Sequence, residues 1–120
     1  MSKFKHRLLA TVALLLAIFT VTPNAMADLR GIDVSGWQSP TVTCTADYDF
    51  AVVKATQGTG FTNGYMTAQA QCVQQRNRRL GFYHYAGGGN ATAEADHYAN
   101  TVRPYSGRAI LVVDWEGYQN

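Results

Sequence analysis

The sequence AILVVDWE, at residues 109–116, places an uninterrupted apolar run directly before two carboxylates. A run that is apolar at consecutive positions, instead of alternate ones, is typical of a parallel strand buried on both faces. Asp114 and Glu116 are two residues apart, so on an extended strand they face the same side and Trp115 faces the other. This stretch therefore predicts a parallel strand that carries a pair of acidic groups at its carboxyl end.

Three earlier runs have a similar character, and helical segments at 65–79 and 91–102 separate the later ones. The runs are LRGIDVSG (29–36), FAVVKAT (50–56) and LGFYHYA (80–86). Strands that alternate with helices predict right-handed βα units and a parallel sheet. We expect an α/β fold of about four βα units, an incomplete (β/α)8-type (TIM-like) barrel, because a complete barrel typically takes about 250 residues.

The two helical segments carry start and stop signals. Asn90 or Thr92 can cap the start of the second segment, and Pro104 ends it. The basic cluster at 76–79 is expected to form the polar end of the first segment, where positive charge suits the helix dipole.

The first 27 residues have the pattern of a secretory signal peptide. Lys3, Lys5 and Arg7 precede an apolar stretch at 8–21, which is followed by the small-residue site Ala25-Met26-Ala27. A membrane anchor is the alternative, but about 14 apolar residues fall short of the roughly 20 that span a bilayer. We expect an exported protein with no stable membrane association after cleavage, whose mature domain covers 28–120.

Removal of this segment changes the balance of charge. Three of the ten Lys and Arg residues precede residue 28, so seven basic residues remain against eight acidic ones, a formal charge of −1. The apparent basicity of the chain therefore belongs largely to the export signal, and nothing in the mature part indicates nucleic-acid binding.

Cys44 and Cys72 are the two cysteines of the chain. In an exported protein a pair of cysteines permits a disulfide, and two separate thiols are the alternative. A zinc site is not expected, since neither cysteine has a second Cys or His at ligand spacing.

Polar and aromatic side chains collect at the carboxyl ends of the four runs, where parallel α/β folds build their sites. They are Asp33, Trp37, Lys54, Tyr83, Tyr85, Asp114 and Glu116. Two carboxyl groups in unequal surroundings can act as acid and as charge stabiliser, which is the division that glycoside hydrolysis requires. Taken singly, the same residues also fit structural roles: a solvated strand end, a turn residue or a packed aromatic ring.

Four segments closely resemble glycoside hydrolase family 25, the Chalaropsis-type lysozymes, in order and spacing. They are GIDVSGWQ (31–38), DFAVVKATQGTGFTN (49–63), GFYHYAGGGNATAEADHYANTV (81–102) and ILVVDWEG (110–117). The resemblance implies a secreted enzyme that cleaves the β-1,4 bond between N-acetylmuramic acid and N-acetylglucosamine in peptidoglycan, without metal or organic cofactor. It also implies that 28–120 is the N-terminal half of the catalytic domain, and that the complete protein is a monomer.

The resemblance implies a role for each residue that matches a motif. Glu116 corresponds to the proton donor, and Asp114 to the partner carboxylate that supports the acetamido group or the developing positive charge. Asp33 corresponds to an acidic residue lining the same cleft. Lys54 and Tyr85 correspond to cleft residues that contact the sugar or hold the carboxylates, and Trp37 is read as a further substrate-binding residue.

Two other functions stay open from the sequence. A chitinase-like barrel also ends its fourth strand in D-x-E, although such enzymes carry further aspartates where this chain has the apolar run 110–113. The non-enzymatic alternative is a catalytically inactive fragment or a sugar-binding remnant. We expect the isolated 120-residue product to be marginally stable and weakly active or inactive, because an open half-barrel leaves its outermost strands unpaired.

Overall fold

The computed structural model describes residues 27–117 of the chain. Within that range the strands are β1 (Gly31–Val34), β2 (Phe50–Gln57), β3 (Phe61–Thr62), β4 (Arg79–Tyr85) and β5 (Ile110–Asp114). The helices are α2 (Val42–Thr45), α3 (Met66–Gln75) and α4 (Ala91–Val102), and a 3-10 turn follows at Arg103–Tyr105. The predicted signal peptide falls almost entirely outside the described residues.

The strands form one sheet in the order β1-β2-β4-β5, and each neighbouring pair in this order is parallel. The short strand β3 pairs with β2 in the antiparallel direction, at the end of a hairpin. The prediction of parallel strands joined by helices is confirmed. Strands β1 and β5 lie at the two edges.

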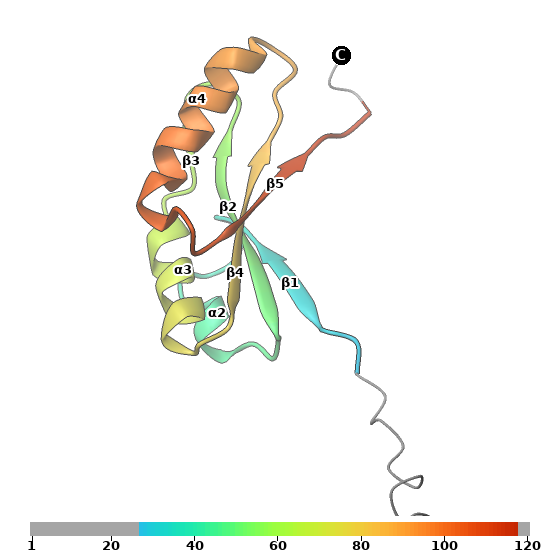
Figure 1. Cartoon of the computed structure of the whole chain (residues 1–120), viewed down its shortest axis with the longest axis vertical. Coiled ribbons are helices and arrows are strands. Elements are labelled where there is room, and N and C mark those ends of the chain that lie inside the picture. Colours follow the sequence, from blue (N-terminus) through green and yellow to red (C-terminus); the bar gives the residue numbers. More distant parts are fainter. Residues whose placement is uncertain (1–26, 118–120) are drawn as a thin grey trace, which may run out of the picture.

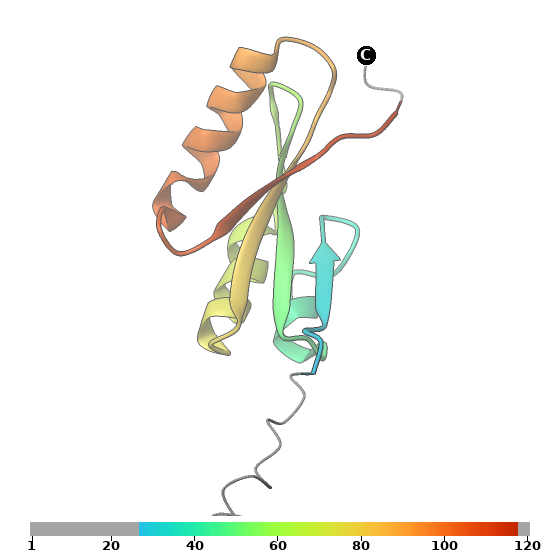
Figure 2. The same cartoon turned by 45° about the vertical axis from the view of Figure 1, so that its right-hand side comes forward.

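Helices α2, α3 and α4 all lie on one side of the sheet, and the other side is open (Figure 1 and Figure 2). Side chains that alternate along the central strands therefore meet two different environments. Val53 of β2 and Phe82 of β4 point to the helices and are fully buried, whereas Lys54 and Tyr83, one residue further on, are half-buried on the open side. The open side receives the predicted site residues.

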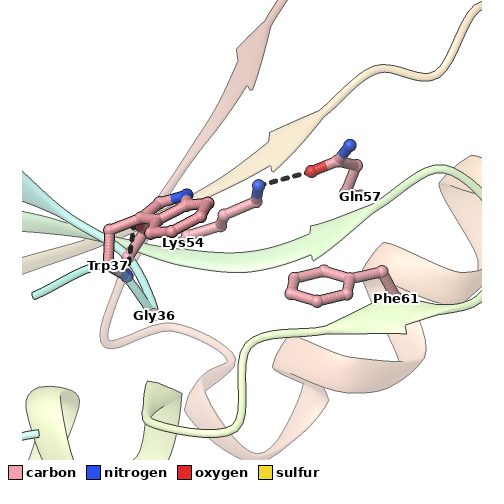
Figure 3. A pocket seen from close by; sticks show the side chains of 6 residues that line it. Gly36, Trp37, Lys54, Gln57 and Phe61 are labelled. Atoms are coloured by element: carbon pink, nitrogen blue, oxygen red, sulfur yellow. Dashed lines mark hydrogen bonds between the residues drawn. The ribbon is translucent and has the colours of Figure 1, made fainter.

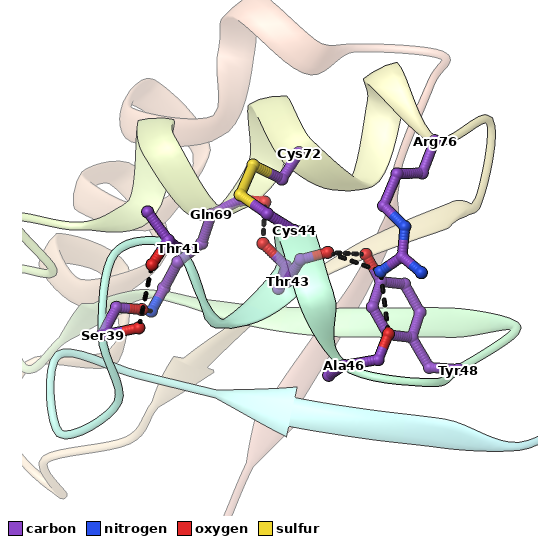
Figure 4. Close-up of a disulfide and its surroundings, with 9 residues drawn as sticks. All are labelled: Ser39, Thr41, Thr43, Cys44, Ala46, Tyr48, Gln69, Cys72 and Arg76. Atoms are coloured by element: carbon purple, nitrogen blue, oxygen red, sulfur yellow. Dashed lines mark hydrogen bonds between the residues drawn. A yellow bond between two sulfur atoms is a disulfide. The ribbon is translucent and has the colours of Figure 1, made fainter.

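A disulfide joins Cys44 of α2 to Cys72 of α3, so of the two alternatives left open by the sequence the structure has the bridge (Figure 4). Around it, the Thr43 hydroxyl donates a 2.7 Å hydrogen bond to the carbonyl oxygen of Gln69. The guanidinium of Arg76 donates to the carbonyl oxygens of Thr43 and Ala46, at 2.9 and 2.8 Å. These contacts fasten the short helix α2, which is too brief to hold itself, onto α3.

The end of the first long helix differs from the expectation. Helix α3 ends at Gln75 and not at 79, because Asn77 adopts a left-handed conformation (φ 53°) and turns the chain back. Arg79 then begins β4. The basic cluster is therefore split among a helix end, a turn and a strand.

The start of α4 follows the expectation. The Asn90 side chain accepts a 3.0 Å hydrogen bond from the Ala93 amide, so Asn90 and not Thr92 is the N-cap. The helix ends at Val102, before the turn that contains Pro104.

Strand β5 differs from the burial that its apolar run predicts. Its four apolar residues, Ile110–Val113, are between 39% and 68% exposed. The strand lies at the edge of the sheet, where α4 covers one of its faces only in part and the other face is open. In the described range, no helix combines the length and the apolar character needed to cross a membrane.

Candidate functional site

Asp33 and Asp114, two of the three predicted acidic residues, line one hollow of about 350 Å³ on the open side of the sheet. They come from the two edge strands, whereas Val52 of β2 and Tyr83 of β4 contribute from the centre. Residues far apart in the sequence meet here because parallel strands bring their carboxyl ends to the same edge of the sheet. The structure thus brings these two carboxylates to one site.

The Tyr83 phenol lies in the electrostatic field of both carboxylates. Its pKa is raised to about 12, first by burial and then by the negative charges of Asp33 and Asp114, while a hydrogen bond with Ser35 acts in the opposite direction. Tyr83 therefore remains protonated at neutral pH. It supplies a hydroxyl group between the two acids.

The end of β4 holds the end of β5 in place. Tyr85 stands opposite Asp114 in the register of the two strands, and the next amide, that of Ala86, donates a 3.0 Å hydrogen bond to the Asp114 carbonyl oxygen. On its other side, the Tyr85 carbonyl oxygen accepts a 3.1 Å hydrogen bond from the Gly58 amide in the β2–β3 hairpin. The backbone at Asp114 is thereby tied through β4 to the hairpin.

Lys54 extends over the open side of β2. Its ammonium donates a 2.5 Å hydrogen bond to Gln57 Oε1 and lies 5.2 Å from the ring centre of Phe61 and 5.1 Å from that of Tyr85. Desolvation lowers the pKa of Lys54, and the negative charge of Asp114 partly opposes this effect. The ammonium is thus held between two aromatic faces on the same side of the sheet as the acids.

A bulge in β2 makes the Lys54–Gln57 contact possible. The register with β4 passes from Lys54 opposite Tyr83 to Thr56 opposite His84, so Ala55 is an extra residue. Ala55 and Thr56 are consequently both buried on the helix side, and Gln57 returns to the open side.

A second hollow, of about 440 Å³, lies around the Lys54 side chain (Figure 3). It is lined by Ser35, Gly36, Trp37, Lys54, Gln57 and Phe61. Trp37 is 93% exposed, so its ring is not a core residue and is available to a ligand. Its loop is shaped by hydrogen bonds from the Ser35 amide to Gln38 Oε1 (2.8 Å) and from the Trp37 amide to the Ser35 hydroxyl (3.2 Å).

Glu116 is placed differently from the other predicted acid residues. Strand β5 ends at Asp114, and Glu116 follows in an exposed, non-strand segment. It is absent from the lining of both hollows within the described part of the chain. Trp115 lies on the other side of β5, in a groove against α4 with Ala95 and Tyr98, as strand alternation predicts.

His84 is buried on the helix side, opposite the site. Its Nε2 lies 2.7 Å from Glu94 Oε2, its Nδ1 lies 2.8 Å from the Thr56 hydroxyl, and its ring stacks on Tyr98. Both ring nitrogens are thus used by buried polar groups, as a core histidine requires.

Tyr83 was predicted among the strand-end side chains, without a role toward the two carboxylates. Gln57 and Phe61, which line the hollow around Lys54, were not predicted. A signal for the last two exists in QGTGFT (57–62), because two glycines between polar and aromatic residues are typical of a hairpin. The bulge has no comparable signal, so the side to which Gln57 points could not be read from alternation.

Comparison with known proteins places this chain in a family. Residues 32–120 match the family described as glycosyl hydrolases family 25. A curated relative, lysozyme M1 from Streptomyces globisporus, is 31% identical over 86 residues, which are 68% of this chain and 29% of the relative.

Two solved structures share the fold. A family 25 glycosyl hydrolase from Bacillus anthracis superposes with a TM-score of 0.62 and 23% identity, over 79% of this chain and 46% of that one. A bacterial lysozyme from Streptomyces coelicolor gives a TM-score of 0.60 and 29% identity, over 75% of this chain and 45% of that one. The chain therefore spans just under half of each solved structure and less than a third of lysozyme M1. Because the family match covers most of its residues, the chain belongs to glycosyl hydrolases family 25.

Proposed function

We propose that this chain is part of a secreted lysozyme-type hydrolase that cleaves the β-1,4 bond between N-acetylmuramic acid and N-acetylglucosamine in peptidoglycan. The observation that carries the proposal is the shared hollow of Asp33 and Asp114, in a chain of family 25. The described sheet then forms one side of a (β/α)8-type barrel, with its open side turned toward the barrel interior.

The chemistry follows from where charge develops during glycoside cleavage. The sugar ring becomes positively charged in an oxocarbenium-like transition state, and the leaving oxygen needs a proton. Asp114 and Asp33, both directed at one hollow, stabilise the positive charge. Glu116, in its exposed segment beyond β5, donates the proton once a glycan brings the glycosidic oxygen to it. The Tyr83 hydroxyl, protonated at neutral pH, donates a hydrogen bond to a sugar oxygen or to a carboxylate.

The test is the clearing of a cell-wall suspension together with release of reducing sugar ends. Glu116→Gln keeps the size of the side chain and removes its proton, so activity should fall by about 10²–10⁴-fold, the contribution of a general acid. Asp49→Asn, which removes a carboxylate beside Arg30 and Arg78 far from the hollow, is the matched control and should leave activity unchanged. Equal activity of the Glu116→Gln protein and the parent would refute the assignment.

Glycan binding without hydrolysis is the second candidate. It is favoured by the position of Glu116 outside both hollows and by the aromatic lining of the hollow around Lys54. Retention of the chain on purified sacculi, with no reducing ends released, would support this candidate over the hydrolase.

A further inference from the structure

We propose that the hollow around Lys54 recognises a carboxylate carried by the glycan, and that Lys54 thereby selects acidic, muramic-acid-containing strands over neutral chitin-like ones. The inference rests on the proposed glycan-binding function and adds to it a residue that decides specificity. The carboxylate has two possible sources, the lactyl ether of muramic acid and the peptide stem attached to it.

The first argument is that Lys54 is a half-buried cation that forms no ion pair with any of the described residues 27–117. Its polar contact is the neutral amide oxygen of Gln57, and its other neighbours are the rings of Phe61 and Tyr85. Within residues 27–117, no carboxylate oxygen lies within 4.0 Å of its ammonium. An ammonium has three donor hydrogens, so donors remain for a ligand.

The second argument is the arrangement of charge along the open side of the sheet. The hollow between β1 and β5 is anionic, with Asp33 and Asp114, and suits a sugar that becomes positive. The same two carboxylates repel a negatively charged substituent. The neighbouring hollow, where Lys54 supplies the cation, is the place on this face where such a substituent is attracted instead.

The third argument is that the hollow is built from anchored parts. The carbonyl oxygen of Phe61 lies 2.9 Å from His97 Nε2 on α4, which fixes the β3 side of the hollow. The Ser35–Gln38 hydrogen bonds fix the loop that presents Trp37 on the other side. Aromatic rings flank a cation, so the hollow can pack a sugar face and bind its acidic group together (Figure 3).

Binding of a sugar to this hollow can be measured by the fluorescence of Trp37. The chain has two tryptophans, and Trp115 lies in the groove against α4 on the other side of the sheet. In the full chain carrying Trp115→Phe, fluorescence therefore reports on Trp37 alone. Two disaccharides are titrated at low salt: N-acetylglucosaminyl-N-acetylmuramic acid, which has a free lactyl carboxylate, and N,N′-diacetylchitobiose, which has none.

We expect the acidic disaccharide to bind about tenfold more tightly than the neutral one, which corresponds to one charge-assisted hydrogen bond. Lys54→Met should abolish this preference, and Lys54→Arg should retain most of it. The preference should also shrink as salt is added. Equal binding of the two disaccharides, a preserved preference in Lys54→Met, or no Trp37 response to either sugar would overturn the proposal.

Two further ligands separate the sources of the carboxylate. In one, the lactyl carboxyl is a primary amide; in the other, it carries a dipeptide that ends in a free carboxylate. Recovery of tight binding with the dipeptide assigns the hollow to the stem, and its failure assigns the hollow to the lactyl group. If Lys54→Met does not fold by circular dichroism, Lys54→Arg and the salt dependence of the parent decide the question.

Binding preference and hydrolysis are measured separately, so the two proposals fail separately. A Lys54-dependent preference for the acidic disaccharide, together with cell-wall clearing that Glu116→Gln leaves unchanged, refutes the hydrolase assignment alone. A chain that clears cell walls without any Lys54-dependent preference refutes the carboxylate site alone.

Discussion

The Glu94 carboxylate lies 2.7 Å from the His84 imidazole in the buried layer between α4 and the sheet. The same carboxylate accepts hydrogen bonds from the amides of Gly87 (2.9 Å) and Gly89 (3.2 Å), in the turn that follows β4. Glu94 thus fastens α4, a central strand and the turn after Tyr85 to one another. The turn follows Ala86, whose amide donates the hydrogen bond that holds the carbonyl oxygen of Asp114.

Replacement of Glu94 by Gln should destabilise the protein in a pH-dependent way. The Gly87 amide, and then His84, lower the pKa of Glu94 from its usual 4.5, so the folded state favours the ionised carboxylate. That stabilisation is complete above pH 4.5 and is lost as the pH falls through the lower folded pKa. We expect Glu94→Gln to reduce the free energy of unfolding by about 1–3 kcal/mol at pH 7, and by less in acid.

Urea unfolding of both proteins between pH 3 and pH 7 measures this difference. Asp96→Asn on the same helix is the control, because Asp96 is exposed and its loss should have little effect at any pH in the range. If Glu94→Gln lowered the free energy of unfolding by the same amount at every pH, the role given to the ionised carboxylate would be contradicted.

Tyr83 should titrate at unusually high pH. Its raised pKa of about 12 means that the folded state favours the neutral phenol. The resulting stabilisation is present below pH 10 and is lost as the pH rises toward 12. In a titration at the absorbance of tyrosinate, the difference between the parent and Tyr83→Phe should therefore appear near pH 12.

Removal of a neighbouring negative charge tests the cause of this shift. Asp33→Asn and Asp114→Asn should each lower the pKa of Tyr83, and Asp49→Asn, which faces Arg30 and Arg78, should not. An unchanged Tyr83 titration in both of the first two variants would mean that burial alone sets the pKa.

The disulfide should account for a large share of the stability of the α2–α3 region. It closes a loop between residues 28 apart, for which chain entropy predicts about 3–4 kcal/mol. Thermal unfolding of Cys44→Ser/Cys72→Ser should occur at a markedly lower temperature than that of the parent. Reductant should lower the transition of the parent toward that of the double variant and leave the double variant unchanged.

Strand β5 should promote self-association of the isolated chain. Leu111 and Val113 are 55% and 61% exposed on an edge strand whose backbone groups can pair with another chain. Val113→Lys should therefore lower the apparent mass in light scattering at high protein concentration. Thr67→Lys adds the same charge at an exposed position of α3 and should have a smaller effect; equal effects would mean that net charge governs the association.

The sequence predicted the elements with strong periodic or apolar signals. The four parallel strands and helix α4, with Asn90 as one of its two candidate caps, follow from run length and capping chemistry. Helix α2 and strand β3 were not predicted, because four and two residues are too short for a period to appear. The predicted burial of β5 was wrong, because the burial of a strand depends on the parts of the protein that cover it and not on its own residues.

The site was predictable where it follows from strand ends and not where it follows from local irregularity. Asp33, Lys54 and Asp114 come from the carboxyl ends of parallel strands and gather on one side, as that topology requires. Glu116 was expected beside Asp114 by alternation, which applies only while the strand continues, and β5 stops at Asp114. The catalytic roles of these residues remain predictions.

Because Ala55 is an extra residue in β2, the alternation of side chains between the two faces of the sheet shifts by one position after it. Positions three apart on a regular strand point to opposite faces, yet Lys54 and Gln57 meet in a 2.5 Å contact on the same face. If β2 paired regularly with β4 beyond Lys54, with Ala55 opposite His84, Gln57 would point to the helix side and could not reach Lys54. The contact that holds the Lys54 ammonium on the same side of the sheet as the acids therefore depends on the bulge in β2 as much as on the identity of the two residues.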